Sequence, residues 1–121
     1  MKVLTIREPY ATLIAKGLKK YEFRTWNTNY RGDIYIHAGK SFFKSHKNFE
    51  FSYRPGEIVA IANIADVIKL DKEIGKKIHD ENPQVYGLNE DGYAWVLNNI
   101  RPITTNKIIK GKLGLWNYEE E

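Results

Sequence analysis

Apolar residues alternate or cluster along the chain in short stretches that predict an α+β domain. Strands are expected over residues 3–6, over 19–26, where Tyr21 and Phe23 share one face, and over 32–38, where Ile34 and Ile36 do. The longest apolar run, residues 58–70, predicts a central strand. Residues 93–100 predict a further strand, and the apolar residues between 108 and 116 predict one or two closing strands.

Helices are expected where the apolar spacing changes to three and four residues. Glu8-Pro9 opens a helix that ends near Gly17, because proline fits the first turn of a helix. Asp71 is a good N-cap for a second helix that runs to about residue 80. Residues 39–48 are expected to form a basic loop or a short helix.

Five to six short strands with two to three flanking short helices predict one α+β domain over residues 1–121. Tight turns link most of the strands, which favours a mostly antiparallel sheet that curls into a barrel. A doubly wound parallel sheet does not fit, because the crossover helices that it needs are too few.

The composition excludes several classes of protein. The chain has no cysteine, which rules out disulfides, thiolate metal sites and cysteine nucleophiles. No apolar run reaches about 18 residues, so we expect no membrane-spanning helix and no membrane partner. The N-terminus meets its second charge at Arg7, too early for the apolar region of a signal peptide, and a cytoplasmic location is expected. The histidines lack metal-ligand spacing, so neither a metal nor another cofactor is expected.

Positive charge and aromatic residues concentrate in the first half of the chain. Residues 1–54 contain eleven Lys/Arg and four Asp/Glu, a net charge of +7, whereas residues 55–121 carry a net charge of −3. Eleven of the sixteen aromatic residues also lie in residues 1–54. This mixture is typical of nucleic-acid binding, because phosphates attract cations and unstacked bases stack on rings. An aromatic core beneath a solvated lysine face explains the same composition equally well.

The densest group of chemically active side chains lies in residues 17–26. Glu22 and Arg24 share one face of the predicted strand, and Lys19 lies at its entrance, where the turn can re-aim the side chain. Such a Lys–Glu–Arg group can bind an anion, orient the polar edge of a base, or perform acid–base chemistry if burial shifts its pKa values. A surface cluster of salt bridges, contributing less than about 1 kcal/mol per pair, would use the same residues.

The pattern G-x-K-x-x-E-x-R, filled by Gly17, Lys19, Glu22 and Arg24, resembles the signature of the ASCH domain family of the PUA-like superfamily. Further segments resemble the family's opening strand and helix, its next loop and strand, and its closing strands: residues 4–11, 26–32, 34–40, 93–96 and 110–116. The likeness therefore spans nearly the whole chain and is weakest over 41–55 and 71–91. It implies a PUA-like β-barrel with flanking helices, and a cleft floored by the motif residues that takes RNA or another nucleic acid.

This resemblance and the charge pattern together predict a site for RNA or single-stranded nucleic acid. The candidate binding residues are the motif and the basic and aromatic side chains expected near it: Lys19, Glu22, Arg24, Arg7, Arg31, Lys40, Tyr10 and Trp26. The motif would form the floor, the other cations would neutralise phosphates, and one of the two rings would stack on a base. Glu22 would accept hydrogen bonds from a base or ribose, because a carboxylate repels phosphate. Solvated charges and a core position for Trp26 are the structural alternatives.

Two other hypotheses remain open. Some small ASCH proteins are amidohydrolases that remove the acetyl group of N4-acetylcytidine, with a lysine base at the position of Lys19, a threonine at that of Glu22 and a glutamate further along the chain. Glu22 departs from this pattern, and Glu81 is the nearest candidate for the later glutamate. An enzyme acting on a modified nucleoside would therefore use Lys19, Glu22 and Glu81, with a lysine–glutamate pair activating water. In the third hypothesis the chain is a protein-interaction module and the motif is structural.

Overall fold

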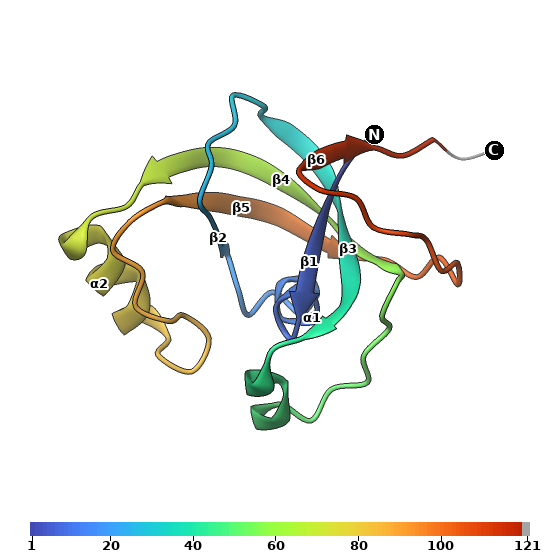
Figure 1. Ribbon diagram of the computed structural model, residues 1–121, viewed down its shortest axis with the longest axis horizontal. Coiled ribbons are helices and arrows are strands. Elements are labelled where there is room, and N and C mark those ends of the chain that lie inside the picture. The colour runs from blue at the N-terminus through green and yellow to red at the C-terminus, as the bar shows by residue number, and fades with distance from the viewer. Residues whose placement is uncertain (120–121) are drawn as a thin grey trace.

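The computed structural model describes residues 1–119, and its elements follow the predicted order (Figure 1). The strands are β1 (Lys2–Glu8), β2 (Tyr21–Arg24), β3 (Gly32–Phe42), β4 (Ile58–Lys69), β5 (Tyr93–Pro102) and β6 (Leu115–Asn117). The helices are α1 (Tyr10–Ala15), α2 (Lys72–Glu81) and a short 3₁₀ helix, η1 (Lys44–Asn48). The predicted α+β class is confirmed.

One curved sheet contains all six described strands, in the order β2-β5-β4-β3-β1-β6. Four of its five pairings are antiparallel, whereas β1 and β3 run parallel. The parallel pair arises because the chain passes through α1 and β2 between these strands and so returns to β1 in the same direction. The sheet curls, as expected, but does not close into a barrel: β2 and β6 form its two edges.

Several predicted boundaries were wrong. Residues 39–42, expected in a basic loop or short helix, extend β3 to Phe42. Backbone hydrogen bonds explain two further differences. The strand expected over 19–26 is only the four residues of β2, because the N–H groups of Leu18 and Lys19 both donate to the Leu13 carbonyl in the turn that leaves α1. The apolar residues at 108–109 form no strand. Instead, the N–H of Ile109 donates to the Gly56 carbonyl and ties an irregular segment to the turn just before β4.

The hydrophobic core has two parts, and α1 contacts both of them. Ile14 faces a cluster on the inner surface of the sheet that includes Ile36 and Trp95. Leu13 faces a second cluster, in which Ile78 of α2 packs near Tyr86. The turn after α1 is therefore held between two buried layers; this turn carries Lys19 and leads into β2, which carries Glu22 and Arg24. Within residues 1–119, neither α-helix has the length and apolar character to cross a membrane.

A buried carboxylate joins β1 to α1. Glu8 is fully buried, and its Oε1 and Oε2 accept hydrogen bonds from the backbone N–H and the hydroxyl of Thr12, at 2.8 and 2.5 Å. Burial raises the pKa of Glu8 above its usual value, although the two bonds from Thr12 oppose this shift. The proton of Glu8 is therefore bound more tightly in the folded protein than in the unfolded chain.

We expect the Glu8 carboxyl to make the protein less stable as pH rises above about 4.5, its ordinary pKa. Between that value and the raised folded-state pKa, the unfolded chain has released the proton that the folded protein still holds, so the free energy of unfolding falls with increasing pH. Glu8→Gln should flatten this part of the profile, measured by denaturant unfolding at a series of pH values. The exposed Glu90→Gln serves as the control, and a Glu8→Gln profile parallel to that of the wild type would contradict the assignment.

Candidate functional site

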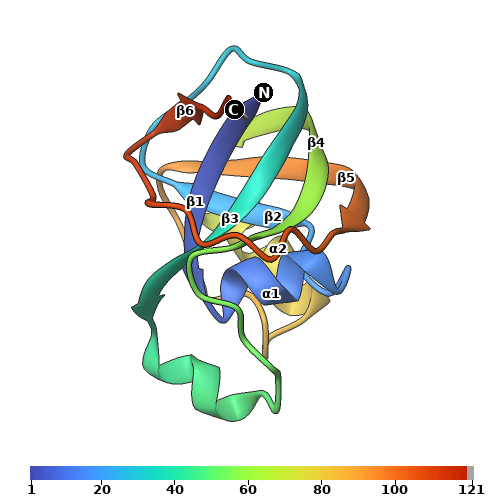
Figure 2. The same cartoon turned by 90° about the vertical axis from the view of Figure 1, so that its right-hand side faces the viewer.

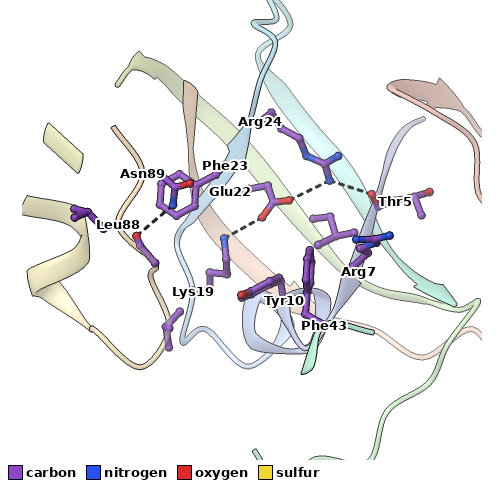
Figure 3. A pocket seen from close by; sticks show the side chains of 13 residues that line it. Thr5, Arg7, Tyr10, Lys19, Glu22, Phe23, Arg24, Phe43, Leu88 and Asn89 are labelled. Atoms are coloured by element: carbon purple, nitrogen blue, oxygen red, sulfur yellow. Dashed lines mark hydrogen bonds and ion pairs between the residues drawn. The ribbon is translucent and has the colours of Figure 1, made fainter. Parts of the chain in front are cut away.

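A pocket of about 580 Å³ opens beside the edge strand β2 and contains the Lys–Glu–Arg motif (Figure 3). Its lining comes from β1, the start of α1, the turn into β2, β2 itself, the residue after β3 and the loop after α2: Thr5, Ile6, Arg7, Tyr10, Lys19, Glu22, Phe23, Arg24, Phe43, Val85, Gly87, Leu88 and Asn89. The open side of the sheet, where β2 has no neighbouring strand, thus becomes a concave site.

The turn after α1 directs Lys19 toward Glu22. Gly17 has a φ of +75°, a left-handed conformation that ends the helix without the strain of a side chain. After this turn the ammonium group of Lys19 donates to Glu22 Oε1 at 2.9 Å and also to the Tyr21 carbonyl (Figure 3). The strand entrance therefore re-aims Lys19 onto the face that carries Glu22.

Glu22 lies between two cations. Its Oε1 contacts Lys19, and its Oε2 lies 3.0 Å from a terminal nitrogen of Arg24, which also donates to the Thr5 carbonyl at 3.0 Å. Lys19 and Glu22 are only 2% and 6% exposed. The Arg24 side chain is 23% exposed, so the motif is a largely buried charge network and not a surface cluster of salt bridges. Removing one member of such a network leaves the others without compensation in a poorly solvated site.

Aromatic rings surround the Lys19 ammonium. Its Nζ lies 5.1 Å from the ring centre of Phe23, 5.5 Å from that of Tyr10 and 5.7 Å from that of Tyr86. Aromatic ring faces attract a cation, but this attraction does not fully compensate for the hydration that the ammonium group loses on burial. Burial lowers the pKa of Lys19 below the usual lysine value, although the Glu22 carboxylate opposes the shift.

The two walls of the pocket differ in chemistry. On one side the Phe43 ring packs on Tyr10 at 5.3 Å, and the Arg7 guanidinium lies 4.9 Å from the centre of the Phe43 ring. On the opposite side Leu88 and Asn89 belong to the loop after α2 (Figure 3). A flat ligand inserted between these walls would contact rings and a cation on one face and a leucine and an amide on the other.

The loop wall was not predicted from the sequence, although Gly75 was a signal for it. Gly75 lies inside α2, and a Cβ built there would be only 1.9 Å from the Asn89 carbonyl oxygen. The glycine therefore allows the loop to approach the helix closely. An isolated glycine in a helical pattern often has such a packing reason, but the pattern does not show which segment approaches it.

Five of the predicted site residues line the pocket: Lys19, Glu22, Arg24, Arg7 and Tyr10. Three other predicted binding residues lie elsewhere. Arg31 is exposed and donates to the carbonyls of Thr28 and Tyr30, and Lys40 is exposed near the end of β3. Trp26 packs against the core with its ring edge-on to Trp95, as its structural alternative anticipated, with ring centres 4.8 Å apart.

Glu81, the third candidate catalytic residue, does not line the pocket. It is exposed at the C-terminal end of α2. Burial and the neighbouring Glu81 carboxylate raise the pKa of Tyr21, so Glu81 lies beside a residue that is itself outside the pocket lining. Of the described residues that line the pocket, Glu22 alone carries a carboxylate. Among residues 1–119, no three His, Asp or Glu side chains converge as metal ligands would.

Comparisons of this chain with a family model, with curated proteins and with solved structures agree with one another. A family model described as ASCH domain matches residues 4–107. Activating signal cointegrator 1 from Homo sapiens is 21% identical over 129 residues, and its Mus musculus counterpart is 22% identical over 134 residues. Each alignment covers 98% of this chain but only 22% of the relative, so this chain spans about a fifth of their length.

Solved structures share the fold. ASCH from Zymomonas mobilis superposes with a TM-score of 0.52 at 17% identity, covering 84% of this chain and 68% of that one. A mutant of ZmASCH from the same organism gives a TM-score of 0.55 at 16% identity, covering 85% and 72%. At this level of identity the similarity establishes the open, curved α+β fold.

The charge network predicts strongly coupled effects of substitution. We expect Glu22→Gln to lower the free energy of unfolding by about 3–5 kcal/mol, because it leaves buried cations without their carboxylate. Adding Lys19→Met, which removes one of those cations and keeps most of the side-chain volume, should recover part of the loss. Denaturant unfolding of both single variants and the double variant measures this coupling. Simple additivity would contradict the network, and Glu90→Gln on the exposed loop is the control.

Proposed function

The chain belongs to the ASCH domain family, and we propose that it binds RNA or single-stranded nucleic acid with one nucleotide seated in the pocket. The observation that carries the proposal is the convergence of a Lys–Glu–Arg floor, an aromatic wall and an arginine rim in one pocket of about 580 Å³. Pockets of this size take small organic groups and bury most of their surface. A single nucleotide fits such a volume, whereas a base-paired stem does not.

The floor supplies groups for the polar edge of a base. Each oxygen of Glu22 contacts one cation and retains a lone pair that can accept from a base amino or imino group. The Nε–H of Arg24 is buried and has no acceptor among the described residues, so this side chain has a donor in excess. Asn89, on the opposite wall, adds an amide that can both donate and accept.

The walls and rim supply stacking and charge. Tyr10 and Phe43 offer ring faces, and base stacking on aromatic side chains contributes about 1–3 kcal/mol per base. The lining holds three basic side chains and one carboxylate, so its field favours a phosphate-bearing ligand. Arg7 is exposed at the mouth of the pocket and is placed to contact a phosphate while the motif stays buried.

Replacement of the rim arginine tests this function. We expect Arg7→Gln to weaken binding of a fluorescently labelled eight-nucleotide single-stranded RNA about fivefold. The slope of log K against log salt should fall by about 0.7, the value for one lost phosphate contact on a single strand. Fluorescence anisotropy at several salt concentrations measures both quantities. Lys72→Gln on the exposed side of α2 is the control, and a wild-type protein that does not bind the RNA would refute the proposal.

A second candidate function is hydrolysis of an acylated nucleoside, favoured by the burial that lowers the pKa of Lys19 inside the pocket. The neutral amine of Lys19 would take a proton from water, and Glu22 would orient that water. Since Glu81 lies outside the pocket, the mechanism would have to proceed with one carboxylate. The word cointegrator in the name of the human and mouse relatives fits the third hypothesis, a protein-interaction module.

Incubation with N4-acetylcytidine separates catalysis from binding alone. An amidohydrolase should release acetate at a rate that increases with pH as Lys19 loses its proton, and Lys19→Met should abolish this release while circular dichroism shows a folded protein. Chromatography of acetate and cytidine is the measurement. Absence of turnover in the wild type would count against the enzyme hypothesis for this substrate and leave nucleotide binding in place.

A further inference from the structure

A segment next to the pocket carries exposed aromatic and basic side chains, most of which do not line the pocket. Residues 40–53, here called the arm, continue the end of β3, form η1 and return toward β4. In Figures 1 and 2 the arm extends away from the body of the sheet as a separate lobe, coloured from teal to green. No residue of η1 is buried.

The arm has two kinds of aromatic residue. Phe49 and Phe51 stack on each other at 5.3 Å and pack against the second core cluster, so they anchor the arm. Phe42 and Phe43 are instead 39% and 40% exposed. The Phe42 ring packs in edge-to-face geometry with the His46 and Tyr53 rings, whose centres lie 5.0 and 5.2 Å away. A rigidly held, exposed ring is suited to stacking on a flat ligand.

The arm is continuous with the pocket through Phe43. This residue lines the pocket, contacts Tyr10 and lies under the Arg7 guanidinium, and its backbone N–H donates to the Glu8 carbonyl at 2.8 Å. Phe42 precedes it on the same exposed stretch of backbone. A chain that leaves the pocket past Arg7 therefore meets the arm directly.

The positive charge of the arm favours a polyanion as its ligand. The arm contains three lysines, Lys40, Lys44 and Lys47, and one carboxylate, the exposed Glu50, so its net charge is +2. All three lysines are exposed, and none forms an ion pair with a described carboxylate. Exposed cations beside exposed rings match the alternating phosphates and bases of a single strand.

We propose that the arm binds the nucleotides that flank the one in the pocket, with a base stacked on Phe42 or Phe43 and phosphates contacted by Lys44 and Lys47. This inference rests on the proposed function and extends it, because it makes the ligand an oligonucleotide and gives the direction in which the strand leaves the pocket. It also accounts for the interleaved rings and lysines of the first half of the chain, which the pocket uses only in part.

The test compares two ligand lengths. Affinities are measured for a labelled eight-nucleotide single-stranded RNA by anisotropy, and for nucleoside monophosphates by competition. We expect Lys44→Gln with Lys47→Gln to weaken octamer binding about tenfold and to lower its salt slope by about 1.4, because two phosphate contacts are lost. Phe42→Leu should weaken octamer binding at least fivefold. Affinity for the monophosphates should stay unchanged in both variants.

The control variant changes two lysines that lie outside the arm. Lys72→Gln with Lys77→Gln removes the same charge from the exposed face of α2 and should leave both affinities as in the wild type. Arm variants that bind the octamer like the wild type would overturn the inference and leave the arm to a protein partner. Equal weakening of octamer and monophosphate would also overturn it, because the arm would then only support the pocket. If the wild type binds neither ligand, the proposed function fails and the arm inference fails with it.

Discussion

The buried Glu22 carboxylate is the interaction on which the architecture of this protein most depends. Lys19 and Arg24 reach it from opposite sides, and Arg24 continues to the backbone of β1 through the Thr5 carbonyl. The edge strand β2 is thereby tied to β1 by side chains where no backbone ladder joins them. Charges removed from water are costly unless they are paired, and here the pairing bridges the opening of a sheet that does not close.

The same network forms the floor of a pocket at the open edge of the sheet. A closed barrel would fill this space with strand pairing, whereas the open edge leaves room for a pocket whose floor is charged and whose walls are aromatic and apolar. Because the floor groups are already compensated, the site can be buried without a ligand and still offer acceptors and donors to one. Arg7 on the rim and the three lysines of the arm, Lys40, Lys44 and Lys47, are exposed outside this network.

Local rules explain how much of this arrangement could be predicted. The N-cap at Asp71, which accepts from the Ile74 N–H, depends on residues near one another in sequence. The shared face of Glu22 and Arg24 depends on the two-residue period of a strand. The placement of Arg31, Lys40 and Trp26 depended on how strands and loops curve in space, which no local period encodes. Arg31 bonds to its own turn and Trp26 fills the core beside Trp95.

The sequence by itself therefore determined the family, the α+β class, the order of the strands along the chain and the charged motif. Each of these depends on residue type and short spacing. Only the tertiary structure decided that Lys19 is buried among three rings, that Gly75 admits the loop carrying Leu88 and Asn89, and that Phe43 meets Arg7 and Tyr10 at the mouth of the pocket. These contacts join residues far apart along the chain, and their formation depends on the simultaneous packing of the sheet, both helices and the arm.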